Sequence, residues 1–515
     1  MIGRDMRRTA LILSLLGSLF LSLLPAVPAA ATTTSIAWAP CSEDATAECG
    51  TLTVPVDWDE PDGETFELAV ARRKATDPEA RIGSLVINPG GPGGSGVSAV
   101  LGGMGFTPEL TSRFDIVGFD PRGVARSHPI LCSLELARQA PDTLSIDSQA
   151  DFDALLAHNE RYRQDCRERT GALYDHVDTG SVVRDLDALR AALGDDKLTY
   201  YGISYGTLIG QLYAERYPGR VRALMLDSNM DHSLGTKAFL DTEAWTAQDS
   251  FDEFVSWCEA TASCALHGRD VRAVWKELLA RADRGELEFP GEPGVTLTRM
   301  SLVSQAFGAF YGPAYQQLAE LLAALESGEG TARAIVTPPA AAQQEQVIND
   351  STRIFCQDWL LPVRDHREWA RLLERSARIA PDMLVSAAAH PITAACLGTP
   401  APIPNPQHRL RVSGTPTLLL GNALHDPATG YPWAVNAARQ IGHEARLLTY
   451  EGWGHGIYGR GPCPTEAIDA YLTSLTVPAN GARCEAVPPA EVSPLRARPL
   501  PGPMPGLPGW TYNLS

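Results

Sequence analysis

Apolar and polar positions follow two different patterns in the first half of the chain. Residues 51–57 and 65–74 alternate apolar and polar around a turn at residues 59–63, which predicts an antiparallel hairpin. Residues 84–87, 114–119 and 221–226 are instead almost continuously apolar. Buried strands of this second kind, separated by helical segments, are typical of a parallel sheet that helices cover on both faces.

This alternation stops near Asp231, and until about Pro404 apolar residues recur at helical spacing. The amphipathic faces comprise Val271, Val274, Trp275, Leu278 and Leu279, then Leu318, Leu321, Leu322 and Leu325, then Trp369, Leu372 and Leu373. Strands resume at residues 415–420 and 445–450. We therefore predict an α/β fold with a large helical domain inserted after the strand that ends near Asp227. That insertion would form a cap over the carboxyl edge of the sheet.

The N-terminal residues 1–31 differ from the rest. Arg4, Arg7 and Arg8 precede an apolar run at residues 10–24 and a small-residue stretch at 25–31, which predicts a secretory signal peptide. The run is short for a bilayer span, so we expect export to the outside of the cell without a stable membrane anchor. The other predicted parts are the core at residues 32–230, the cap at 231–404, the second part of the core at 405–485 and a Pro-rich tail at 486–515.

Charge and cysteine content narrow the classes of partner. A formal net charge of −18 disfavours nucleic acids and anionic membranes. Ten cysteines, an even number in an exported chain, indicate disulfides. Because no Cys-x-x-Cys or His-x-x-x-His pair occurs, we expect no metal site and no cofactor. We expect a monomer.

The sequence Gly-Ile-Ser-Tyr-Gly at residues 202–206 is the central motif. It lies between a β-prone run at residues 197–201 and a helical pattern at 207–217. A strand, a sharp turn with serine at its apex and a helix form a nucleophile elbow, in which glycines avoid backbone clashes. The five-residue pattern alone is common by chance, but its position between strand and helix predicts a serine hydrolase with Ser204 as nucleophile.

A serine nucleophile requires a base and an acid that orients it, and in this fold they follow the serine along the chain. Asp426 comes after the strand at residues 415–421, and His455 comes after the next strand. These residues complete the predicted triad. Asp227 is the alternative acid. His425 precedes the acid and is not expected to face it.

Two backbone N–H groups are expected to bind the oxyanion of the tetrahedral intermediate. One belongs to Tyr205, directly after the nucleophile. The other is expected from Gly91, in the sequence Asn-Pro-Gly-Gly-Pro-Gly-Gly-Ser-Gly at residues 88–96. A phosphate-binding loop is the rival interpretation of these glycines, but no Gly-Lys-Ser/Thr follows them.

The motifs at residues 88–96, 120–123, 202–206, 426–429 and 454–456 together resemble a known family. They look like the motifs of the secreted bacterial tripeptidyl aminopeptidases, which are grouped with the prolyl aminopeptidases among the α/β-hydrolase serine peptidases. The resemblance extends from about Cys41 to Cys484 and includes the cysteine spacing, but it departs at Gly430, where relatives usually carry proline. It implies a serine exopeptidase that removes short peptides, such as tripeptides, from free N-termini through an acyl-enzyme.

An exopeptidase of this kind must bind the substrate ammonium, and a carboxylate in the cap would do so. Asp358 is the first candidate, and Glu253 and Asp252 follow, although acids of this kind are more often solvated on a helix face. A carboxylesterase or other acyl hydrolase with the same triad remains the alternative function. A binding protein that has lost the chemistry is a third possibility, against which the ordered Ser, Asp and His speak.

We expect the cysteines to pair with their sequence neighbours, because each pair then stays within one structural unit, although sequence alone fixes no connectivity. The predicted pairs are Cys41 with Cys49, Cys132 with Cys166, Cys258 with Cys264, Cys356 with Cys396, and Cys463 with Cys484.

Overall fold

The computed structural model describes residues 35–288, 294, 296–328 and 347–489, and ten of the described strands form one sheet. The predicted signal peptide and most of the predicted tail lie outside these residues. The strand order is β1-β2-β3-β5-β4-β7-β8-β10-β11-β12. The strands are β1 (Ala39–Pro40), β2 (Glu48–Pro55), β3 (Thr65–Arg73), β4 (Gly83–Asn88), β5 (Phe114–Phe119), β7 (Leu198–Ile203), β8 (Val221–Asp227), β10 (Leu418–His425), β11 (Ala445–Trp453) and β12 (Arg483–Cys484).

The sheet is mostly parallel, as the apolar strands predict. β2 and β3 form the predicted hairpin, with Glu48 opposite Arg72 and Pro55 opposite Thr65. β3 also pairs antiparallel with β5, whereas the strands from β5 to β12 in the spatial order are all parallel. The carboxyl ends of β4, β7, β8, β10 and β11 therefore meet at one edge, where α/β sheets bind their ligands.

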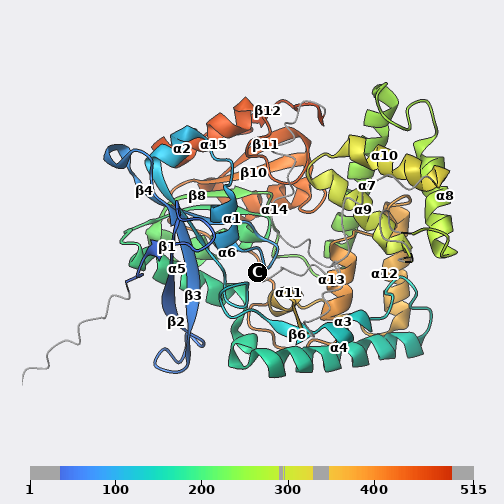
Figure 1. Cartoon of the computed structure of the whole chain (residues 1–515), viewed down its shortest axis with the longest axis horizontal. Coiled ribbons are helices and arrows are strands. Elements are labelled where there is room, and N and C mark those ends of the chain that lie inside the picture. The colour runs from blue at the N-terminus through green and yellow to red at the C-terminus, as the bar shows by residue number, and fades with distance from the viewer. Residues whose placement is uncertain (1–34, 289–293, 295, 329–346, 490–515) are drawn as a thin grey trace, which may run out of the picture. The chain divides into compact units, whose positions relative to one another are not determined.

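Successive residues of the buried strands point to opposite faces of the sheet. In β4, Leu85 and Ile87 pack into one hydrophobic core, while Val86 packs into another. Helices cover both faces (Figure 1). One face is covered by α1 (Gly96–Gly102), α2 (Pro108–Arg113) and α15 (Pro462–Ser474), and the other by α5 (Thr179–Ala192), α6 (Tyr205–Arg216) and α14 (Tyr431–Ile441). Short 3₁₀ helices lie at Pro78–Ala80, Ala172–His176, Pro218–Arg220 and Gly442–Glu444.

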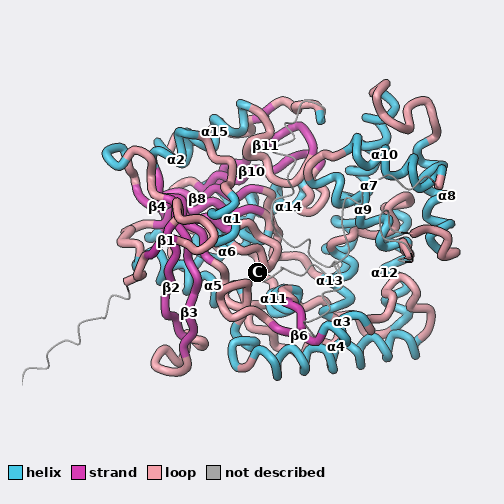
Figure 2. Tube along the Cα trace, in the orientation of Figure 1, coloured by secondary structure: helices cyan, strands magenta, loops and turns pink. Residues whose placement is uncertain are grey.

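The described residues between β8 and β10 are mainly helical, which Figure 2 shows as cyan coils apart from the magenta sheet. A hydrophobic core of their own, which includes Phe251, Trp275 and Phe307, joins four of these helices. They are α7 (Thr236–Ala260), α8 (Val271–Asp283), α9 (Arg299–Tyr311) and α10 (Tyr315–Ser327). The remaining three are α11 (Thr352–Asp358), α12 (His366–Ile379) and α13 (Ala389–Cys396).

Two elements near this helical region were not predicted. The 22-residue helix α4 (Gln149–Thr170), which contacts α12, buries His158 and Asn159 between apolar residues, so its apolar stripe is interrupted in the sequence. A strand β9 (Val347–Asn349) pairs with β6 (Leu131–Ser133), where only helices were expected, because three residues are too few to give a pattern. The short helix α3 (Leu134–Arg138) follows β6. No helix in the described ranges is long and apolar enough to cross a membrane.

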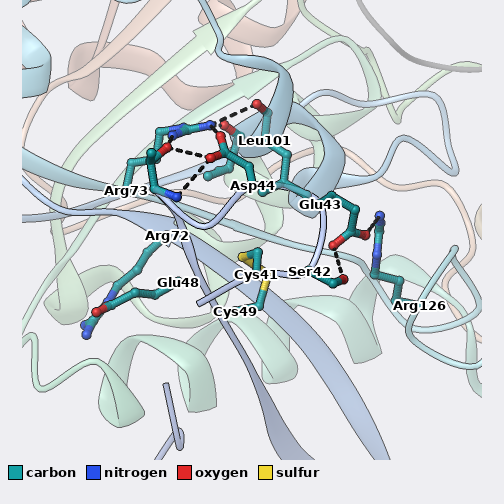
Figure 3. Close-up of a disulfide and its surroundings, with 12 residues drawn as sticks. Cys41, Ser42, Glu43, Asp44, Glu48, Cys49, Arg72, Arg73, Leu101 and Arg126 are labelled. Atoms are coloured by element: carbon teal, nitrogen blue, oxygen red, sulfur yellow. Dashed lines mark hydrogen bonds and ion pairs between the residues drawn. A yellow bond between two sulfur atoms is a disulfide. The ribbon is translucent and has the colours of Figure 1, made fainter. Parts of the chain in front are cut away.

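All ten cysteines form disulfides, and they join the pairs that the neighbour rule predicts: Cys41–Cys49, Cys132–Cys166, Cys258–Cys264, Cys356–Cys396 and Cys463–Cys484. Figure 3 shows the first of them, beside which Arg73 donates to Asp44 and to the Leu101 carbonyl, the latter at 3.0 Å. This anchors the segment before β2 to the end of α1.

A buried ion pair ties the loop after β5 to α5. Arg122, in the Asp-Pro-Arg-Gly motif, is fully buried and donates to both carboxylate oxygens of Asp185 at 2.7 Å. It also donates to the carbonyls of Pro55, Val56 and His176. Every donor direction of the guanidinium is therefore used, which offsets the cost of burying the charge.

Replacing Arg122 by methionine should lower the free energy of unfolding by about 3–5 kcal/mol, because the Asp185 charge would remain buried without its partner. Urea denaturation measures the loss. The matched control is Arg378→Met, whose side chain is 60% exposed and whose surface ion pair with Glu374 should be worth about 1 kcal/mol or less. Equal effects of the two variants would contradict this account.

Candidate active site

The predicted nucleophile occupies a strained turn between β7 and α6. Ser204 has φ 57° and ψ −123°, a region that non-glycine residues rarely adopt. The turn is possible because its flanking glycines let backbones touch. A Cβ on Gly202 would lie 2.5 Å from the Gly206 carbonyl oxygen, and one on Gly206 would lie 2.6 Å from the Asn88 carbonyl oxygen. In the described part of the chain the Ser204 hydroxyl makes no hydrogen bond, and the side chain is almost buried.

The glycine-rich loop after β4 packs directly against this turn. A Cβ on Gly90 would lie 2.4 Å from the Ile203 carbonyl oxygen and 2.9 Å from the Ser204 Cβ. Gly91, with φ 118°, lines the same cavity as Ser204 and Tyr205. Gly91 and Tyr205, whose backbone N–H groups are predicted to bind the oxyanion, therefore line the same cavity.

The predicted base and acid are joined by a hydrogen bond. His455 Nδ1 lies 2.9 Å from Asp426 Oδ1, and both side chains are buried. This contact assigns the imidazole proton to Nδ1 and leaves Nε2 as the basic nitrogen. Burial alone would raise the pKa of Asp426, but His455 and further donors, among them the Thr429 N–H, outweigh it and lower that pKa. Asp426 is thus a carboxylate.

His455 contacts two residues that line the cavity containing Ser204. Thr429 Oγ1 lies 3.5 Å from His455 Nδ1, and the Tyr311 ring centroid lies 4.8 Å from that of His455. Both of these neighbours line the cavity together with Ser204. The Tyr311 carbonyl also accepts from the His455 backbone N–H at 3.0 Å, so the end of α9 helps to fix the loop of the histidine.

Asp227, the alternative acid, has a different task. It is fully buried and accepts from the Tyr201 hydroxyl at 2.7 Å. It also accepts from the backbone N–H groups of Ile457 at 2.8 Å and Tyr458 at 3.1 Å. Asp227 therefore holds the turn that follows His455, while Asp426 contacts the imidazole.

The cavity at the carboxyl edge of the sheet is enclosed mainly by apolar side chains from helices of the insertion. Its apolar lining comprises Met230, Phe239, Tyr311, Phe355, Ala388, Ala389, Ile392, Ala428 and Trp433. Ser204, Tyr205, Gly91 and Thr429 lie on its core side. A substrate carbonyl held at Ser204 would thus meet a largely water-free surface, which strengthens electrostatic contacts.

None of the three candidate amine-binding acids, Asp358, Glu253 and Asp252, is among the residues that line this cavity. Asp358 is fully buried behind Tyr205, where it accepts from the Tyr205 hydroxyl, from Thr179 N at 2.9 Å and from Asn405 Nδ2 at 2.6 Å. Burial, with Asp178 nearby, raises the pKa of Asp358 to about 7. Its oxygens are thus occupied by the protein itself. Glu253 instead accepts from the Trp453 indole N–H at 2.6 Å.

The acid that does line the cavity is Glu243 of α7, which sequence reasoning missed. It is 1% exposed, and one oxygen accepts from Ser386 at 2.9 Å. The other oxygen, Oε1, has no hydrogen-bond partner among the described residues. Burial, and the Asp426 charge to a smaller extent, raise the pKa of Glu243 well above its usual range.

A sequence feature could have revealed Glu243. The buried stripe of α7 contains Phe239, Leu240, Ala244, Ala247, Phe251 and Phe254. Glu243 lies four residues from Phe239 and from Ala247, on the same face of the helix. An acid inside an apolar stripe is rare unless it is paired or functional.

Comparisons with known proteins identify the family of the chain. Residues 83–462 match the family described as alpha/beta hydrolase fold. The chain is 35% identical to the serine protease Hip1 of Mycobacterium tuberculosis, over 87% of this chain and 91% of that protein. It is 31% identical to the tripeptidyl aminopeptidase of Streptomyces lividans, over 87% and 86%. It is also 31% identical to carboxylesterase B of Mycobacterium tuberculosis, over 86% and 87%.

The two buried acids at the sheet edge can be told apart by substitution. Asp426→Asn should lower kcat about 10⁴-fold, because the amide would favour the wrong tautomer of His455. Asp227→Asn keeps an acceptor for the N–H groups after His455 and should lower kcat less than tenfold. Hydrolysis of an activated ester measures both. A larger loss in Asp227→Asn than in Asp426→Asn would exchange their roles.

Proposed function

The chain belongs to the α/β-hydrolase family of serine hydrolases and peptidases, and we propose that it is an aminopeptidase that releases short peptides from free N-termini. The proposal depends above all on one observation. The cavity that contains Ser204 also contains Glu243, whose Oε1 has no partner among the described residues. A buried, half-satisfied acid in an apolar cavity is a binding site for a cationic group.

In the proposed mechanism Ser204 attacks the substrate carbonyl while His455 Nε2 takes the hydroxyl proton. Asp426 holds the imidazole and stabilises its cation. The backbone N–H groups of Gly91 and Tyr205 bind the oxyanion. The protonated imidazole then gives its proton to the leaving amine, and an acyl-enzyme forms on Ser204. Attack of water, with His455 again as base, releases the N-terminal fragment.

Glu243 is proposed here as the acid that binds the substrate ammonium, in place of Asp358 and Glu253. Free Glu243 is kept neutral by its apolar surroundings, as its raised pKa indicates. An arriving ammonium favours the carboxylate, so binding exchanges a proton on Glu243 for the cation of the substrate. In an apolar cavity this ion pair is stronger than at the surface, which supports selection for a free N-terminus.

An esterase is the second candidate, since a relative bears the name carboxylesterase B and the same triad serves both reactions. Glu243 is the observation that favours the peptidase, because a neutral ester has no need of a buried acid. A tripeptide as the released fragment is suggested by the tripeptidyl aminopeptidase relative. Amides of one, two and three residues would measure the preferred length.

We also propose that the protein acts outside the cell as a monomer, on peptides, without nucleic acid or membrane partners. Five disulfides suit an oxidising compartment, and they support export through the predicted signal peptide.

The central experiment is Glu243→Gln with matched substrates. For peptides with a free N-terminus, kcat/KM should fall about 10²–10³-fold, because the glutamine cannot pair with the ammonium. The wild type should discriminate against N-acetylated peptides by a similar factor. Hydrolysis of a small activated ester should change little in the variant.

Ser204→Ala is the matched control, and it should lower peptide and ester hydrolysis alike, by about four to six orders of magnitude. Equal cleavage of free and acetylated peptides by the wild type would contradict the aminopeptidase and favour the esterase or an endopeptidase.

Glu243→Gln should also make the protein more stable than the wild type as the pH rises. With a raised pKa, native Glu243 holds its proton more tightly than the unfolded chain does, so wild-type stability falls from about pH 4.5 upward until the folded pKa is passed. Glutamine does not titrate. The melting temperature of Glu243→Gln should therefore equal that of the wild type near pH 4 and exceed it increasingly toward neutral pH. A constant difference would show that Glu243 is ionised in the free protein.

A further inference from the structure

One face of α7 carries four polar residues at helical spacing: Glu243, Thr246, Asp249 and Glu253. Separations of three, three and four residues place these side chains above one another on the helix. Glu243 lines the cavity, whereas Asp249 and Glu253 contact the last residues of β10 and β11. Thr246 lies against Gly430, in the loop that follows Asp426. This row links the substrate cavity to the triad within a single helix.

Asp249 binds the residue directly before the acid. His425 Nδ1 lies 2.9 Å from Asp249 Oδ2, and His425 is the last residue of β10, next to Asp426. The His425 carbonyl accepts from Gly454 N–H at 3.2 Å, and Gly454 immediately precedes His455. Through one residue, α7 therefore contacts both loops of the triad.

Glu253 makes the second contact, one helical turn further on. It accepts from the indole N–H of Trp453 at 2.6 Å, and Trp453 ends β11 two residues before His455. The rings of Trp453 and His425 are nearly parallel, with centroids 6.2 Å apart. The two contacts therefore belong to one interface between α7 and the ends of β10 and β11.

Thr246 shows how closely α7 approaches the acid loop. A Cβ on Gly430 would lie 2.2 Å from Thr246 Oγ1. Gly430 is the N-cap of α14 and comes directly after Thr429, which donates to Asp426. Because Gly430 has no Cβ, it permits this close contact.

We propose that α7 positions the Asp426 and His455 loops through Asp249–His425 and Glu253–Trp453, so that the triad is set for catalysis only while this helix is docked. Asp249 and Glu253 are thus positioning residues. The inference rests on the catalytic roles proposed for Asp426 and His455. It adds to them a dependence on the insertion that neither the triad nor the ammonium site requires.

The charge of His425 makes this contact sensitive to pH. Asp249 and Glu253 face it from α7, and Trp453 faces it from β11. Tyr315 of α10 lies close to the same two acids, and the Arg460 guanidinium lies close to Tyr315. Burial disfavours the imidazolium, but the Asp249 carboxylate, with Glu253 beyond it, raises the pKa of His425 above its usual value. The attraction is therefore complete below about pH 6.5 and is lost as the pH rises through the folded pKa.

The test measures how fast a fluorophosphonate labels Ser204, since this reaction needs the triad but no substrate ammonium. Asp249→Ala should lower the labelling rate about tenfold. For a free peptide and for an activated ester, kcat should fall by the same factor while KM stays within about twofold. Asp249→Asn keeps the acceptor and removes the charge, so the alkaline decline of its labelling rate should move to lower pH.

Asp241→Ala is the matched control, because Asp241 lies on the same helix and pairs with Lys237 and Arg375, both at 2.6 Å. It should label at the wild-type rate. A second pair tests the close contact: Gly430→Ala should slow labelling, and adding Thr246→Ala should restore it. If Asp249→Ala does not fold, the pH profile of Asp249→Asn and the Gly430 pair decide the question.

Wild-type rates and an unchanged pH profile in the Asp249 variants would overturn the positioning role and leave the proposed function intact. A wild type that the probe does not label at Ser204 would overturn the proposed function, and this inference with it. A rise in KM alone, with the labelling rate and kcat unchanged, would make Asp249 a substrate-binding residue and would also overturn the positioning role.

Discussion

The contact of backbone on backbone around Ser204 is the constraint on which the rest of the site depends. Three glycines, Gly90, Gly202 and Gly206, meet neighbouring main chain at distances that no Cβ tolerates. Together they hold Ser204 in its strained conformation at the end of β7. Because β8, β10 and β11 follow in the sheet and run parallel to β7, the loops after them lie along the same edge as this turn.

The insertion adds what a parallel sheet cannot supply. The edge of the sheet offers backbone N–H groups, a hydroxyl and an imidazole, all suited to attack on a carbonyl. The helices add an apolar wall with one buried acid, Glu243. That acid costs stability when it ionises in the free protein, and it gains a partner when a cation enters. The apolar side chains around Glu243 thus raise the free energy of its carboxylate in the free protein, and they also strengthen its attraction to a bound cation.

The sequence indicated the sheet well, because buried strands leave a local pattern, and the triad was predicted from the same pattern. Continuous apolar runs mark strands buried on two faces, and Asp426 and His455 each follow such a run. The orientation of the helices was not predictable in this way. Asp358 ends α11 beside a disulfide. Its side chain points toward Thr179 and Asn405, which lie far away in the sequence, so the sequence around Asp358 does not reveal its direction. Glu253 likewise points to the indole of Trp453 and not into the cavity. In the sequence, the one feature that distinguishes Glu243 is that it is an acid within the apolar stripe of a helix.

The five disulfides also determine how this enzyme can change. Each joins residues no more than 40 positions apart, and those inside the insertion, Cys258–Cys264 and Cys356–Cys396, remain within it. No covalent bond beyond the two chain connections therefore fastens the insertion to the sheet. Selection can replace the helices over the cavity, and with them the preferred substrate, without breaking a cross-link in the core. What such an exchange must preserve is a short row of polar residues on the first helix.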